Sequence, residues 1–233
     1  MTLDSVDLTI WYAGIVLDAV LLGLLMRRRV YKDLPVSFIY LLWSLSYDLV
    51  AWQLMRTLSP EACLQQYMVG ITVNALFVFA VWIELGRKVL RYNGARTPGR
   101  FFVFLLFLVA CLPLWLLAQQ APLSASHTVF RLLFAHLRQI IGILMVAVLL
   151  TMAWLSRILD LRWPERELRI ATGFGFTFIV SLAVNILQNH WFAYPIHRLL
   201  DQISVAGYLG TLAYWVLSFS QNETKQQKYY PQV

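Results

Sequence analysis

The chain of 233 residues is 60% hydrophobic and 13% charged, whereas a typical soluble domain is about 45–50% apolar and about 25% charged. Its formal net charge of +7 comes from basic residues that lie between apolar runs. No nucleic-acid motif accompanies them, so we expect no nucleic-acid partner. Long stretches without charge favour a polytopic membrane protein over a soluble one.

Seven apolar segments are each long enough, or nearly so, to cross a hydrocarbon core about 30 Å thick. We therefore predict an all-α bundle of seven transmembrane helices that forms a single membrane domain over residues 1–233. The predicted spans are approximately 8–26, 34–55, 67–89, 101–118, 128–155, 170–188 and 199–219.

The basic residues concentrate in alternate connections between these spans. Fifteen of the nineteen Lys and Arg lie in the first, third and fifth connections and in the C-terminal tail. Because cytoplasmic loops carry the excess of Lys and Arg, this pattern predicts the N-terminus outside and the C-terminus inside. We expect a multi-pass protein of the cell's inner (plasma) membrane, with the lipid bilayer as its first partner.

The connections are short and leave no room for a soluble catalytic domain. We therefore do not expect an enzyme and assign no catalytic residue. If the chain signals, we expect it to act through another membrane protein or a cytoplasmic signalling protein.

The fifth span carries polar residues within an apolar helix, namely Arg131, His136, Arg138 and Gln139. A charged group at the centre of a membrane helix costs about 2.5–3.5 kcal/mol on insertion scales, so it usually has a partner or a task. At about 100° per residue, Arg131 and Arg138 fall on one stripe with Gly142. We expect the other helices to be arranged around this one.

Polar side chains on other spans lie at comparable depths. At about 1.5 Å per residue, Asp18 and Arg138 fall near the midplane, and the remaining polar groups fall in the outer half. This convergence predicts an outward-facing polar cavity in which Arg138 could hold a carboxylate or phosphate through paired hydrogen bonds. The candidate ligand-binding residues are Arg138, His136, Gln139, Asp48, Asn74 and Asn185.

A structural interpretation of the same residues is also open. Asp18 or Asp48 could form a buried ion pair with Arg138, while Asn and Gln side chains join neighbouring helices. The two interpretations are compatible, because such a pair could form the floor of a pocket. The histidines show no HxxxH or HExxH spacing and the last span has no lysine, so we expect neither a metal nor a cofactor.

Two segments of the first hundred residues carry a family resemblance: RRRVYKDLPVSFIYLLWSLSYDLV and FVFAVWIELGRKVLR. They resemble an uncharacterised family of small bacterial seven-helix integral membrane proteins. In that family an R-R-x-x-Y-x-x-x-P-x-F-x-x-Y-L type segment opens the second helix, and the third helix carries an inward Glu. With irregular spacing, the corresponding residues are Arg28, Arg29, Tyr31, Pro35, Phe38, Tyr40, Leu41 and Glu84.

The layout is also distantly similar to the seven-helix sensory input modules of bacterial signalling proteins. These resemblances imply an architecture and carry over no activity. The leading hypothesis is a receptor-like or sensory membrane protein whose outward-facing cavity takes a small anionic ligand. The alternative is a non-catalytic subunit of a larger membrane complex, and an intramembrane hydrolase or small transporter ranks below both.

Overall fold

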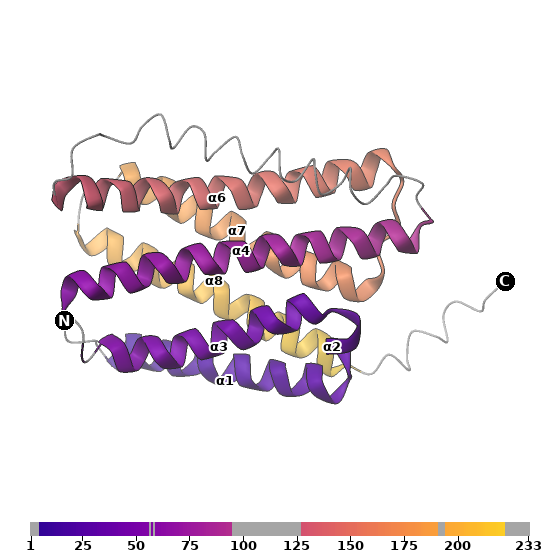
Figure 1. Cartoon of the computed structure of the whole chain (residues 1–233), viewed down its shortest axis with the longest axis horizontal. Coiled ribbons are helices and arrows are strands. Elements are labelled where there is room, and N and C mark those ends of the chain that lie inside the picture. The colour runs from indigo at the N-terminus through magenta and orange to yellow at the C-terminus, as the bar shows by residue number, and fades with distance from the viewer. Residues whose placement is uncertain (1–4, 56, 58, 95–126, 191–193, 222–233) are drawn as a thin grey trace.

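The computed structural model describes residues 5–55, 57, 59–94, 127–190 and 194–221, and of residues 127–140 it describes the backbone only. Within these ranges the chain forms helices and no strand (Figure 1). The helices are α1 (Ser5–Arg27), α2 (Val30–Asp33), α3 (Pro35–Met55), α4 (Pro60–Tyr92), α6 (His127–Ile158), α7 (Glu165–His190) and α8 (Tyr194–Ser220).

Six of the predicted spans each coincide with one long helix, so the all-α class is confirmed for the described residues. The predicted fourth span, 101–118, lies outside them. The short helix α2 was not predicted. Stretches of α1, α4, α6, α7 and α8 are long and apolar enough to cross a membrane, and α3 is apolar but shorter. These helices indicate a membrane-embedded protein, and the number of crossings stays a prediction.

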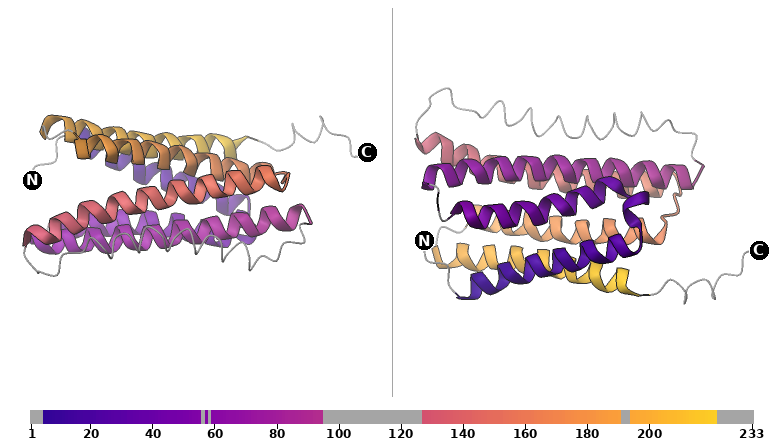
Figure 2. Two further views of the ribbon diagram at one scale, coloured as in Figure 1. Left: turned by 90° about the horizontal axis from the view of Figure 1, so that it is seen from above. Right: turned by 60° about the horizontal axis from the view of Figure 1, so that its bottom comes forward.

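The long helices pack side by side in a closed ring, of which Figure 2 gives two further views. Around the ring, α1 contacts α3, α3 contacts α4, α4 contacts α6, α6 contacts α7, α7 contacts α8, and α8 returns to α1. Contacts between α4 and α7 cross the interior. The helix α6 is thus one member of the ring. The expectation that the other helices surround it was wrong, because its polar residues suggested a central position that an amphipathic helix in a ring satisfies equally well.

Large apolar side chains fill the half of the bundle nearest α2. Leu21, Trp82 and Leu212 are fully buried there. Phe174 of α7 lies at the centre of an aromatic cluster, with its ring 5.0 Å from that of Trp215 and 5.5 Å from that of Tyr40. Such tilted and edge-on pairs add to the stabilisation that burial provides. We call this packed half of the bundle the floor.

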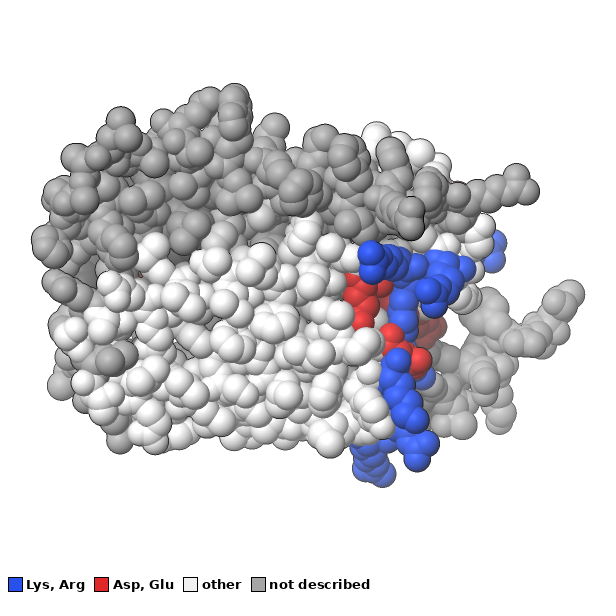
Figure 3. All heavy atoms as spheres, viewed as in Figure 1, with Lys and Arg blue, Asp and Glu red and all other residues white. Residues whose placement is uncertain are grey.

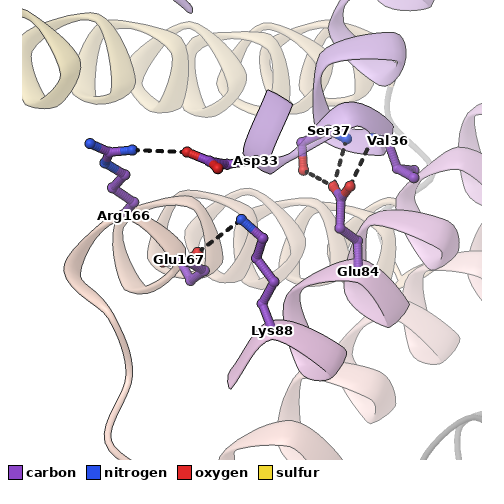
Figure 4. A network of polar contacts seen from close by, with 7 residues as sticks. All are labelled: Asp33, Val36, Ser37, Glu84, Lys88, Arg166 and Glu167. Atoms are coloured by element: carbon purple, nitrogen blue, oxygen red, sulfur yellow. Dashed lines mark hydrogen bonds and ion pairs between the residues drawn. The ribbon is translucent and has the colours of Figure 1, made fainter. Parts of the chain in front are cut away.

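The backbone N–H groups at the N-terminus of α3 donate hydrogen bonds to a carboxylate on a neighbouring helix. Pro35 begins α3 and has no backbone N–H to satisfy. The next two N–H groups, of Val36 and Ser37, each donate to a Glu84 oxygen at 2.9 Å, and the Ser37 hydroxyl donates to the same carboxylate at 2.8 Å (Figure 4). Glu84 thus acts as a helix cap contributed by α4, and its negative charge lies at the positive end of the α3 dipole.

Charged side chains gather at the end of the bundle where α2 lies (Figure 3). We call this end, formed by residues 27–33, 87–91 and 157–169, the charged face. Ion pairs there join helices that are distant in the sequence (Figure 4). These pairs are Arg166 with Asp33 at 3.3 Å and Lys88 with Glu167 at 3.7 Å. A third pair, Arg169 with Glu165 at 3.4 Å, lies within α7.

Candidate functional site

Five helices border a cavity of about 350 Å³ in the half of the bundle away from the charged face. Its lining reaches from Phe174 and Trp215 in the buried floor to Tyr67, whose side chain is 41% exposed. Each helix contributes residues three, four or seven positions apart, the spacing that places side chains on one helical face. On α3 these are Tyr40, Trp43, Ser44, Tyr47 and Asp48.

Among the described side chains, the polar part of the lining comes from all of these helices except α6. It consists of Tyr40, Ser44, Tyr47, Asp48, Tyr67, Asn74, Thr177, Ser181, Asn185, Ser204, Tyr208 and Thr211. Three residues that the sequence nominated, Asp48, Asn74 and Asn185, are therefore brought to one cavity from α3, α4 and α7. The rest were missed, although small polar residues recur every four positions, as in Thr177, Ser181 and Asn185. That spacing in the sequence could have identified this polar face of α7.

The remaining nominated residues lie on α6. The side chains of His136, Arg138 and Gln139 lie outside the described residues. Gly142, one turn further along the same helix, does line the cavity. The suggested ion pairs of Arg138 with Asp18 or Asp48 stay predictions for the same reason.

Two of the cavity's polar side chains make no hydrogen bond or ion pair with the described residues. Asn185 is 8% exposed and its amide Nδ2 faces the open space beside Gly142. Asp48 is half-buried next to Tyr47 on the cavity side of α3. Both side chains can therefore form hydrogen bonds with water or with a molecule that enters the cavity.

Asp18, which the sequence places near the midplane, lies behind the cavity wall and is fully buried. The Tyr208 hydroxyl donates to both of its carboxylate oxygens, at 3.3 and 3.1 Å. The Ser44 hydroxyl lies 3.2 Å from the Tyr208 oxygen. The three residues join α1, α8 and α3 in one chain of hydrogen bonds, and within the described residues Tyr208 is the hydrogen-bond partner of Asp18.

Replacing Tyr208 with phenylalanine is expected to lower the free energy of unfolding by about 1–3 kcal/mol, because the buried Asp18 carboxylate loses its donor. Tyr214→Phe is the matched control, since Tyr214 lies on the same helix and is 39% exposed. It should change the stability by less than about 0.5 kcal/mol. Unfolding by dodecyl sulfate in mixed micelles measures both, and equal effects would contradict this role of Tyr208.

Hydroxyl groups also hold α7 and α8 together at the cavity floor. The Thr177 and Thr211 hydroxyl oxygens lie 2.7 Å apart, and the Thr211 hydroxyl also lies 3.2 Å from the Gly207 carbonyl oxygen and 3.3 Å from that of Gly173. The contacts of Thr211 with Thr177 and with Gly173 join the two helices, as interhelical hydrogen bonds do in membrane bundles, whereas the contact with Gly207 lies within α8. At the floor, α7 and α8 are therefore joined by hydrogen bonds as well as by apolar packing.

No group of three or more potential metal-ligating side chains occurs in the parts of the chain that the structure describes. Glu84, the acidic residue of the family resemblance, is engaged with the backbone of α3. Comparisons with protein-family models, with curated proteins and with solved structures found no match. The resemblance to a bacterial seven-helix family therefore stays a prediction, and the function has to be inferred from the fold and the cavity.

Proposed function

We propose that this chain is a receptor-like or sensory membrane protein that binds a small molecule in the cavity. The observation that carries the proposal is that Asp48 and Asn185 border this space with no hydrogen-bond partner among the described residues. The volume of about 350 Å³ falls within the range of about 300–1,000 Å³ that is common for small-molecule sites. A few polar groups on an aromatic lining also match the usual composition of such sites.

We further propose seven spans in the inner (plasma) membrane, with the N-terminus outside and the charged face in the cytoplasm. The gathering of Lys and Arg at the charged face supports this orientation (Figure 3), because cytoplasmic segments carry the excess of basic residues. The cavity, which lies in the opposite half, would then open outward. A signalling protein that reads the occupied state would contact the charged face.

The charge of the ligand is a separate question. The anionic ligand predicted from the sequence depends on Arg138, whose side chain lies outside the described residues. The proposal that the cavity binds a small molecule depends instead on Asp48, Asn185 and the space between them.

Equilibrium dialysis against a metabolite extract tests ligand binding without assuming a ligand class. Ser181 lines the cavity, so the Ser181→Trp variant should fill it, whereas Ile179 is 58% exposed on the same helix and Ile179→Trp should not. Mass spectrometry should find at least one compound enriched by the wild-type protein and by Ile179→Trp and lost from Ser181→Trp. The same retained compounds with all three proteins would overturn the proposal.

A further inference from the structure

We infer that the cavity takes a small organic cation with an ammonium group, and that Asp48 is its counter-ion. This inference rests on the proposed function, because it specifies the ligand of the same cavity. It is based on the charge, the aromatic rings and the hydrogen-bonding groups of the described lining.

The first observation is the charge of the lining. Asp48 is the ionisable carboxylate among the described lining residues, which include no Lys, Arg or His. No described residue forms an ion pair with it. A carboxylate in a poorly solvated site interacts strongly with a nearby cation, because the local dielectric constant is far below that of water. An ammonium group in the cavity would supply a counter-charge to Asp48.

The second observation is the ring of aromatic side chains on the same part of the lining. Trp43 and Tyr47 precede Asp48 on α3, and their ring centroids lie 5.9 Å apart. Tyr67 borders the cavity from α4. Gly70 keeps the space for the Tyr47 ring, since a Cβ atom at this position would overlap it. Faces of Trp and Tyr attract cations, and aromatic side chains are the usual means of recognising a quaternary ammonium group.

The third observation is that the Tyr208 hydroxyl faces the cavity as an acceptor. Its proton is donated to Asp18, so its oxygen can only accept further hydrogen bonds. Ser44, 3.2 Å away, is its neighbour on the cavity side. Because the Ser44 hydroxyl already lies within hydrogen-bond distance of the Tyr208 oxygen, the acceptor left open on this part of the described lining is the Asp48 carboxylate. A carboxylate suits a ligand that carries donors and a positive charge.

Choline and its neutral isostere 3,3-dimethylbutan-1-ol provide the direct test, because they differ mainly in the charge. Binding to the purified full chain in detergent is measured by tryptophan fluorescence and by isothermal calorimetry, at one fixed ionic strength. Choline should bind at least about tenfold more tightly than the isostere. This comparison uses the wild-type protein and does not depend on the folding of a variant.

Asp48→Asn should weaken choline binding by about tenfold or more and leave binding of the isostere unchanged. The matched control is Asp33→Asn, which removes a carboxylate from the charged face and should leave choline binding unchanged. Equal binding of choline and the isostere, or binding of neither, would overturn the inference. Tighter binding of propionate than of choline would also overturn it, by pointing to an anionic ligand, and would leave the cavity as a ligand site. The dialysis experiment decides the proposed function independently of all three outcomes.

Discussion

Replacing Glu84 with alanine is expected to lower the free energy of unfolding by about 2–4 kcal/mol. The Glu84 carboxylate accepts the backbone N–H groups of Val36 and Ser37 and the Ser37 hydroxyl, all within 2.9 Å. Loss of a helix cap costs about 0.5–2 kcal/mol. The expected loss is larger here because a buried donor left without a partner can cost about 1–3 kcal/mol, and three part-buried donors share this one carboxylate. Unfolding by dodecyl sulfate in mixed micelles measures the change.

Two further variants show whether the carboxylate at this position matters in the way that the geometry implies. Glu84→Gln keeps one acceptor oxygen but loses the charge, so its effect should be intermediate. Glu165→Ala removes an acidic side chain that is 60% exposed and pairs with Arg169, and exposed pairs contribute about 0–1 kcal/mol. If Glu84→Ala lowered the free energy of unfolding by no more than Glu165→Ala does, the capping role of Glu84 would be wrong.

The Gly173→Ala substitution is expected to destabilise the contact between α7 and α8 by about 1–3 kcal/mol, the usual cost of overpacking. A Cβ atom at Gly173 would overlap the Trp215 indole. That indole is 4% exposed and donates to the Arg169 carbonyl oxygen at 3.1 Å, so it cannot move aside without losing buried contacts. The same unfolding measurement detects the loss.

Gly210→Ala is the control for this substitution, with the opposite expected sign. No atom lies within 4 Å of a Cβ atom placed at Gly210, which is inside α8. Alanine there should leave the stability unchanged or raise it by up to about 1 kcal/mol, because alanine favours the helix more than glycine does. A loss of stability as large as that of Gly173→Ala would show that the contact with Trp215 does not explain the effect at Gly173.

The helices were predictable because the signal for each is local. A run of apolar residues long enough to cross a bilayer specifies a helix whatever its neighbours are. The helix α2 was not predictable in the same way. Its four residues carry no periodicity, and its position depends on the turn at Arg29, where φ is 54°.

The depth of the candidate site residues along their helices could be predicted from the sequence, but their contacts with other helices could not. Counting residues along each helix placed Asp48, Asn74 and Asn185 in the outer half of the bundle, and all three line the cavity. Depth does not say how each helix is rotated or which helices are neighbours. The hydrogen bond from Tyr208 to Asp18 and the capping of α3 by Glu84 depend on both, so they required the structure.

The side from which the cavity can be reached is measured most directly by thiol labelling in intact cells and inverted membrane vesicles. Single cysteines are introduced into a Cys63→Ser, Cys111→Ser background and treated with charged, membrane-impermeant methanethiosulfonates of both signs. The positions are Ser181 in the cavity, Ile179 on the exposed apolar side of the same helix, and Ser220 at the end of α8 beside the charged face.

Ser181→Cys should react in intact cells, because the proposed orientation makes the cavity open outward. Ser220→Cys should react only in inverted vesicles, and Ile179→Cys in neither, because a lipid-facing thiol is out of reach of a charged reagent. Reaction of Ser181→Cys only in inverted vesicles, or ready reaction of Ile179→Cys from the water, would contradict an outward-opening cavity in a membrane-embedded bundle.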